Sequence, residues 1–340
     1  MKKSLLALAV LGAFTGVASA QSSVTLYGTL DMNGRYVKAD NQDRRMSMGT
    51  NGIASSQLGF RGIEDLGGGL KAGFILLADL APIDAGNVGA KFFGRRATVS
   101  LLGGFGEVRL GRDYRPDFWN QTIFDAFGTN GLGSSLNVRQ MYGGTRMDNS
   151  IGYFLPSNLG GFYGQAMVGA SEGGTSLDRA GQLVSGRVGF AAGPFDIALA
   201  AAQQRLDLIA GAPDQKTYNI GGSWNFGFAK LMGYFDRETR SDNSMRETMG
   251  SISAVIPFGQ SEVHVGYDRS KFRPAVGSET SVDQIKATYQ YNLSKRTALY
   301  TTASRLANKD ATTLTLPGAA GATTAGGDST GIEFGIRHFF

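Results

Sequence analysis

Apolar and polar residues alternate with a period of two along most of this chain. Between 217 and 226, Tyr218, Ile220 and Trp224 alternate with polar or small residues, and the run 284–293 repeats the pattern. Successive side chains of a strand point to opposite faces, so these runs predict strands with one apolar and one polar face. Each run is about ten residues long, which is the length of a tilted membrane-spanning strand rather than of a typical strand in a soluble sheet.

The last ten residues of the sequence show the same alternation. The apolar face of this predicted strand carries Ile332, Phe334, Ile336 and Phe340. His338 interrupts that face, and Glu333 and Arg337 lie on the other. Chain ends usually fray, whereas the last strand of a closed barrel pairs with the first. We therefore expect the last ten residues to pair antiparallel with a strand that starts near Val24, with Glu333 and Arg337 facing water.

The connections between the predicted strands alternate between short turns and long stretches. Glycine-rich turns such as 66–69 and 103–106 are short. The long polar stretches between them are 38–52, 115–144, 172–181, 207–214 and 308–328. This layout is typical of an all-β, antiparallel up-and-down barrel, and the count predicts about sixteen strands in one domain over 21–340. The stretch 308–328 is rich in Ala, Gly and Thr, and we expect a mobile surface loop there.

Residues 1–20 have the pattern of a cleaved export signal. Two lysines precede an apolar run over 5–17, and the small residues Ala-Ser-Ala at 18–20 form a cleavage site. The apolar run is too short to span a bilayer as a helix. We expect the mature chain to begin at Gln21.

Composition and motifs exclude several classes of function. The net charge of +5 falls to about +3 without the signal, which is too small to indicate nucleic-acid binding. The chain has no cysteine and only two histidines, His264 and His338, and it lacks the common hydrolase and nucleotide-binding motifs. We therefore expect no metal, no cofactor and no enzyme. The alternative, a barrel enzyme that uses a lumenal acid or His264, has no feature in its favour.

The charged residues of greatest interest are arginines in the first half of the chain. These are Arg61, Arg95, Arg96, Arg109 and Arg146. Alternation places Arg61 and Arg146 on the polar face of their strands, as it does Asp31 and Arg35 of the first strand. An arginine facing lipid at mid-bilayer costs about 2–4 kcal/mol, so we expect these side chains to line a pore. The alternatives are an arginine at the membrane interface or one at a subunit contact.

The stretch 115–144 is too long for a simple connection. It carries Trp119, Phe124 and Phe127, and a solvated loop seldom contains so many aromatic residues. We expect it to fold into the barrel and to pack on the wall, with Asp117 and Asp125 facing the arginines across a narrowed lumen. Opposed charges of this kind filter ions by sign. The alternative is an extracellular flap.

Taken together, several motifs resemble the general porins of Gram-negative outer membranes, in particular those of betaproteobacteria. The segments that carry the resemblance are 23–28 (SVTLYG), 58–62 (LGFRG), 64–72 (EDLGGGLKA), 93–97 (FGRRA), 105–114, 148–153 (DNSIGY) and 335–340 (GIRHFF). The resemblance implies a sixteen-stranded barrel that forms a homotrimer in the outer membrane. It also implies passive diffusion of ions and small hydrophilic solutes, and a third extracellular loop folded into the lumen.

The resemblance also assigns roles to individual residues. Arg95 and Arg146 match constriction arginines of the family, although local alternation favours Arg96 over Arg95 as the inward residue. A β-bulge could reconcile the two. Phe340 matches the terminal aromatic of the family's membrane-insertion signal, and His338 belongs to the same segment.

The chain departs from the family pattern at two places. Ser56-Gln57 replaces Ser-Arg, so one wall arginine is missing, and Asp125 to Gly128 lacks the glutamate of the usual Pro-Glu-Phe-Gly. Three or four arginines against one or two aspartates nevertheless predict a porin with a preference for anions. The alternatives are a channel specific for one solute, and an adhesin or receptor that acts through its extracellular loops, 308–328 among them.

Overall fold

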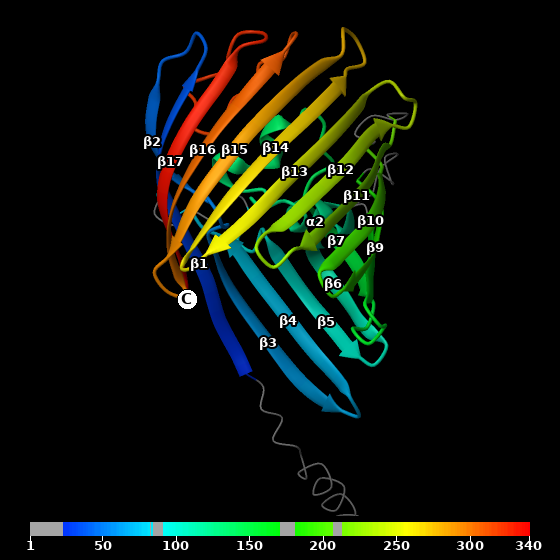
Figure 1. Cartoon of the computed structure of the whole chain (residues 1–340). Helices are drawn as coiled ribbons and strands as arrows, with labels where there is room; N and C mark the ends of the chain where they lie inside the picture. Colours follow the sequence, from blue (N-terminus) through cyan, green and yellow to red (C-terminus); the bar gives the residue numbers. More distant parts are fainter. Residues whose placement is uncertain (1–22, 82, 84–90, 171–180, 207–212) are drawn as a thin grey trace, which may run out of the picture.

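The alternating segments form a closed antiparallel sheet in the computed structural model of the chain (Figure 1). The structure describes residues 23–81, 83, 91–170, 181–206 and 213–340. The expected export signal at 1–20 and much of the predicted loops 172–181 and 207–214 lie outside the described residues. No helix within the described ranges is long and apolar enough to cross a membrane.

Within the described residues, seventeen strand segments make up the sheet. In chain order they are β1 (Ser23–Ala39), β2 (Arg45–Thr50), β3 (Gln57–Gly67), β4 (Leu70–Asp79), β5 (Arg96–Gly103), β6 (Gly106–Tyr114), β7 (Arg146–Phe154), β8 (Phe162–Gly169), β9 (Leu183–Ala192), β10 (Phe195–Gln204), β11 (Gln215–Asn225), β12 (Lys230–Arg240), β13 (Arg246–Phe258), β14 (Ser261–Arg273), β15 (Thr280–Asn292), β16 (Thr297–Lys309) and β17 (Asp328–Phe339). Strands β2 and β3 pair with different halves of β1 and so share one place in the barrel. The prediction of sixteen strands is thereby confirmed.

The two ends of the described chain close the barrel. Strand β17 pairs antiparallel with β1 over eleven residues, from Thr29 opposite Phe339 to Ala39 opposite Ser329. The backbones of Gly28 and Phe340 exchange two hydrogen bonds of 3.1 Å. A Cβ atom on Gly28 would lie 2.3 Å from the Phe340 ring, so the glycine makes room for the terminal aromatic. The expected pairing of the last strand with the first is confirmed.

The faces of the barrel are reversed relative to a soluble protein. Outward-pointing Leu199, Ile285 and Phe334 are exposed, whereas inward-pointing Asn219 and Gln284 are buried. On the last strand, the predicted apolar positions Ile332, Ile336 and Phe340 are exposed on the outer face, and His338 accompanies them there. An exposed apolar belt around a polar interior is the arrangement that a lipid bilayer requires.

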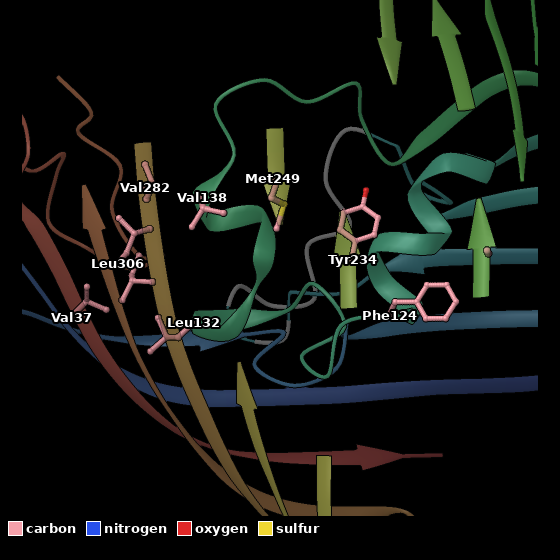
Figure 2. Close-up of a cluster of buried hydrophobic side chains, with 10 residues drawn as sticks. Val37, Phe124, Leu132, Val138, Tyr234, Met249, Val282 and Leu306 are labelled. Atoms are coloured by element: carbon pink, nitrogen blue, oxygen red, sulfur yellow. The ribbon is translucent and has the colours of Figure 1, made fainter. Parts of the chain in front are cut away.

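The main cluster of buried apolar side chains lies inside the barrel (Figure 2). Phe124, Leu132 and Val138 come from the connection between β6 and β7 and pack against wall residues such as Leu306. Leu316 is also buried in this cluster, so the prediction of a surface loop over 308–328 is wrong at that residue.

The connection between β6 and β7, residues 115–145, is called the inner loop below. It contains α2 (Pro116–Ile123) and two short 3-10 helices, η2 (Gly131–Gly133) and η3 (Ser135–Val138). Pro116 occupies the first helical position of α2, where its missing N–H is not needed. Helix α2 lies within the ring of strands (Figure 1) and contacts β8 to β11. The inner loop thus crosses the interior of the barrel.

Candidate functional site

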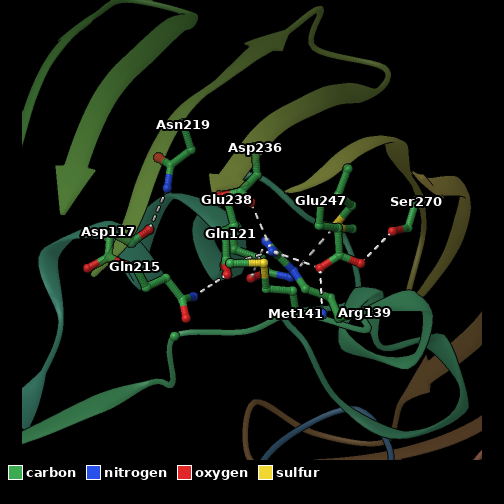
Figure 3. Close-up of polar contacts among 12 residues, drawn as sticks. Asp117, Gln121, Arg139, Met141, Gln215, Asn219, Asp236, Glu238, Glu247 and Ser270 are labelled. Carbon is green, nitrogen blue, oxygen red and sulfur yellow. Dashed lines mark hydrogen bonds and ion pairs between the residues drawn. The ribbon is translucent and has the colours of Figure 1, made fainter. Parts of the chain in front are cut away.

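Arg139 of the inner loop lies at the centre of a buried cluster of ion pairs (Figure 3). One guanidinium nitrogen lies 2.8 Å from Asp236 and 2.9 Å from Glu238 of β12, and all three side chains are at most 3% exposed. Glu247 of β13 accepts the backbone N–H groups of Gln140 and Met141, each at 2.9 Å. Burial alone would lower the pKa of Arg139, but the carboxylates around it raise that pKa well above its ordinary value. The arginine therefore stays charged and ties the loop to the wall.

Lys286 of β15 provides a second anchor for the inner loop. Its ammonium lies 3.3 Å from Asp125 of the loop and 2.8 Å from Asp268 of β14, and none of these side chains is more than 1% exposed. The same ammonium lies 4.5 Å from the centre of the Phe127 ring. Asp125 is thus neutralised against the wall, and the expectation that it faces the arginines across the lumen is wrong.

Asp117, the other acid of the inner loop, is also paired. Both of its carboxylate oxygens accept hydrogen bonds from Arg115, at 3.1 and 3.0 Å, and Ser185 of β9 donates a third at 2.8 Å. The ion pair is almost fully buried. Since Asp117 is satisfied by its sequence neighbour, the expectation that it faces the arginine side is wrong as well.

The polar residues of the first strand are buried under the loops. Asp31 accepts the backbone N–H groups of Gly52, Ile53 and Ala54, and so fixes the segment between β2 and β3. Arg35 donates two hydrogen bonds to Glu333 of β17, at 2.9 and 2.7 Å. Asp31, Arg35 and Glu333 are at most 9% exposed, so the prediction that they line the open water channel is wrong.

Arg95 and Arg146 meet on the opposite side of the interior. Both donate a hydrogen bond to the Tyr114 hydroxyl, at 2.8 Å from Arg95 and 3.2 Å from Arg146. Arg95 also lies 2.6 Å from Asp79, whereas Arg146 has no carboxylate within 4.0 Å in the part of the chain that the structure describes. The Tyr114 ring stacks on Phe118 of α2, with centroids 5.9 Å apart. Two guanidiniums therefore share one neutral acceptor beside the inner loop.

Arg96 and Arg109 form a second group next to the first. Their guanidiniums lie 2.9 and 2.6 Å from Asp113, and Arg109 also lies 2.8 Å from Glu107. Arg61 stands apart, exposed, opposite Thr25 of β1. We call the five residues Arg61, Arg95, Arg96, Arg109 and Arg146, on or beside β3 to β7, the arginine wall. Among the described residues, three carboxylates, Asp79, Glu107 and Asp113, lie within 4.0 Å of these five guanidiniums, which leaves an excess of two positive charges there.

The conflict between Arg95 and Arg96 is resolved by the start of strand β5. The strand begins at Arg96, which lies opposite the buried Leu77, so alternation applies to Arg96 and not to Arg95. The register between β4 and β5 has no shift, so the suggested bulge is absent there. A register shift occurs instead between Gly111 and Asp113 of β6. Arg96 therefore points inward by strand alternation, and Arg95, which precedes the strand, is not bound by that alternation and also reaches the interior.

The inner loop presents no unpaired charge to the arginine wall. Its charged residues are Arg115, Asp117, Asp125 and Arg139, and each is held in a buried ion pair. The side chains that remain partly or fully accessible include Trp119, Thr122 and Ile123. An ion beside the inner loop therefore meets neutral groups on the loop side, and the arginine wall with its fewer carboxylates on the other.

His264 links the barrel wall to the inner loop. Its Nδ1 lies 2.7 Å from the carbonyl oxygen of Ala126, and its Nε2 lies 3.3 Å from Glu262. These residues and the half-buried Arg337 line a small interior pocket of 180 Å³. Arg337 thus faces the interior.

Sequence reasoning missed the residues that organise the site. Tyr114, Asp79 and Asp113 hold the arginine wall, and Arg139 and Lys286 hold the loop. Tyr114 lies in a segment that carries the family resemblance and directly precedes the long loop. This position is the sequence feature that could have identified it as a site residue. The partners of Arg139 lie about a hundred residues away, and no pattern in the sequence points to them.

Comparisons with known proteins agree with this architecture. Residues 7–311 match the family model of the Gram-negative porin. The chain is 42% identical over its full length to outer membrane porin protein 32 of Delftia acidovorans, and 28% identical to an outer membrane porin protein of Bordetella pertussis, each covered completely. A solved structure of an anion-selective porin from Comamonas acidovorans superposes with a TM-score of 0.84, at 38% identity, over 94% of this chain and 100% of that one.

Proposed function

This chain belongs to the Gram-negative porin family and forms a channel in the outer membrane, and we propose that this channel passes anions in preference to cations. Ions and small hydrophilic solutes diffuse passively through the water-filled space between the inner loop and the arginine wall. The proposal involves no cofactor, metal or enzymatic step, and it includes a mature chain of residues 21–340 that assembles as a homotrimer.

The observation that supports this selectivity is the unequal pairing of charges on the two sides of the channel. Arg146 has no carboxylate partner among the described residues, and Arg95 shares its hydroxyl acceptor. The acids that could oppose them across the channel, Asp117 and Asp125, are buried in ion pairs of their own. An anion therefore gains Coulomb energy beside the wall, and a cation loses it. The anion selectivity of the Comamonas relative supports the same direction.

Flux through reconstituted protein tests the proposal. Glucose and gluconate are similar in size, but only gluconate carries a negative charge. In proteoliposomes at low ionic strength, we expect gluconate to enter faster than glucose by severalfold. Equal entry, or faster entry of glucose, would contradict an anion preference while leaving the channel function intact.

No observation favours the alternatives of a solute-specific channel or of an adhesin. Phe340 is proposed to contribute to membrane insertion as well as to barrel closure, because its backbone completes the pairing with Gly28.

A further inference from the structure

An apolar groove of about 1240 Å³ follows β9 to β12. Its floor contains Gly186 and Ala201, which are cross-strand partners and leave a hollow between larger neighbours. Exposed, outward-pointing Val188 and Leu199 stand beside them. From β12 the groove takes only the outward residues Phe235 and Arg237. The groove therefore opens on the outer face of the barrel, toward lipid, and not into the channel.

Basic side chains collect at one end of this groove. Arg237 of β12 lines the groove, and its cross-strand partner on β11 is Tyr218. Lys216 is two residues from Tyr218 on β11, so it lies on the same outer face near Arg237. Farther along the same outer face, Arg246 of β13 lies directly opposite Arg273 of β14, and Lys271 follows. We call these five residues the rim patch. Like charges placed opposite each other on neighbouring strands are destabilising unless an anion neutralises them.

The rim patch differs from the other outer-face cations in its lack of acidic partners. Within the described ranges, no carboxylate lies within 4.0 Å of any of its members, and Arg273 donates only to the carbonyl oxygen of Asn243. By contrast, Arg305 pairs with Asp328, and Lys309 lies 2.7 Å from Asp283. The inner faces of β12 and β13 carry Asp236, Glu238 and Glu247, but these are committed to the inner loop.

We propose that this face is a binding site for a phosphate-bearing lipid of the surrounding leaflet. The acyl chain lies in the groove over Gly186 and Ala201, and the phosphate sits on Arg237 and Lys216, with the rest of the rim patch completing the charge balance. Apolar burial favours the chain in the hollow, and clustered basic residues at the membrane surface attract anionic headgroups. The site requires the outer-membrane location of the family but not the proposed anion selectivity of the channel.

Binding to purified, detergent-solubilised protein tests this proposal. The probes are a short-chain phosphatidic acid, the matching phosphatidylcholine and inorganic phosphate, measured by calorimetry at low ionic strength. We expect the phosphatidic acid to bind at least tenfold more tightly than either of the others. Equally tight binding of phosphatidylcholine would show that the basic residues do not recognise the headgroup. Equally tight binding of inorganic phosphate would show that the groove does not bind the acyl chain. Either result overturns the proposal.

Two variants separate the headgroup site from the acyl groove. Arg237→Gln should weaken phosphatidic acid binding about tenfold, whereas Arg305→Gln, at a cation already paired with Asp328, should leave it unchanged. Gly186→Leu fills the groove, and its Cβ would meet only the Gln165 carbonyl oxygen, at 3.8 Å, so the fold should tolerate it. This variant should weaken lipid binding and leave phosphate binding as it was.

Contrary outcomes are equally clear. Unchanged lipid binding in Gly186→Leu, or equal losses in Arg237→Gln and Arg305→Gln, would overturn the site. A shift of Gly186→Leu to a smaller assembly in size-exclusion chromatography, without a change in lipid binding, would assign the groove to a second copy of the chain instead. Gluconate flux should be the same in all three variants, so a failure of the lipid site is distinct from a failure of the channel proposal.

Discussion

The two sides of the channel interior both carry many charged residues, but they pair them differently. Toward β12 to β15, Arg139 (Figure 3) lies close to Asp236 and Glu238, and all three side chains are at most 3% exposed. Lys286 is paired with acids in the same buried way. On the arginine wall, Arg146 has a phenol and a threonine hydroxyl as its hydrogen-bond partners. The first arrangement fixes the inner loop, and the second leaves charge for a passing ion. Burial and pairing, rather than the number of charges, decide which side sets the field.

Removal of an anchoring charge should produce the largest effect on the protein. Arg139→Met leaves Asp236, Glu238 and Glu247 as buried carboxylates without their cation. Removing one partner of a buried ion pair lowers the free energy of unfolding by about 3–5 kcal/mol. We expect a clear drop in the midpoint of thermal unfolding, together with noisier and larger single-channel currents as the loop loosens.

The matched control for this variant is Arg305→Met, which removes a solvent-exposed pair with Asp328. Exposed pairs contribute about 0–1 kcal/mol, so the midpoint should hardly move. Similar unfolding midpoints for the two variants would show that the Arg139 cluster does not anchor the loop.

Removal of an unpaired charge from the arginine wall should change conduction and leave the fold intact. A unit charge at about 4 Å is worth about 1 kcal/mol in water, or about fivefold in local anion concentration. Arg146→Ala should therefore lower single-channel conductance in 0.1 M KCl by up to that factor. The loss should shrink in 1 M KCl, where the screening length falls from about 10 Å to about 3 Å. A loss of the same size at both salt concentrations would indicate a change of pore shape instead.

Asp79→Asn should act in the opposite direction and more weakly. Asp79 is the partner of Arg95, and its side chain is 42% exposed, so solvent and salt already screen part of its charge. We expect the ratio of chloride to potassium permeability to rise by about twofold, measured by the reversal potential in a salt gradient. A fall in that ratio would show that Asp79 serves mainly to position Arg95.

Tyr114→Phe should have the smallest effect of the four. The variant removes the hydroxyl that accepts from Arg95 and Arg146 but keeps both charges and the ring that stacks on Phe118. The permeability ratio should change by less than twofold. A change as large as that of Arg146→Ala would show that selectivity depends on how the Tyr114 hydroxyl positions the guanidiniums, and not mainly on their charge.

The sequence was a good guide to which face a strand residue occupies. Period-two alternation predicted the barrel, its closure by the last strand and the inward position of Arg96, because a barrel repeats one simple rule on every strand. The aromatic content of the inner loop predicted its packing on the wall. These predictions rest on local patterns, which the closed sheet preserves.

The pairing of charges could not be predicted in the same way. Lys286 reaches Asp125 from a strand 161 residues away, and Asp117 is taken by Arg115, two residues before it. Alternation predicts that an acid points inward, but it does not predict whether that acid faces water or is paired with a basic side chain. Alternation along the sequence runs from Ser150 back to Arg146. In the structure a register shift between Gly111 and Asp113 of β6, beside Asn149 with its φ of 49°, interrupts that alternation, and nothing in the sequence shows the shift. The sign of the channel field therefore required the three-dimensional partners.

The reversal potential of the wild-type channel and of the double variant Arg95→Ala with Arg146→Ala, in parallel across a tenfold KCl gradient, tests the central claim most directly. The reversal potential of the wild type should have the sign of the chloride equilibrium potential. The reversal potential of the double variant should shift substantially toward the potassium equilibrium potential. A wild-type potential on the potassium side, or identical potentials for the two proteins, would contradict the account of a field set by the arginine wall.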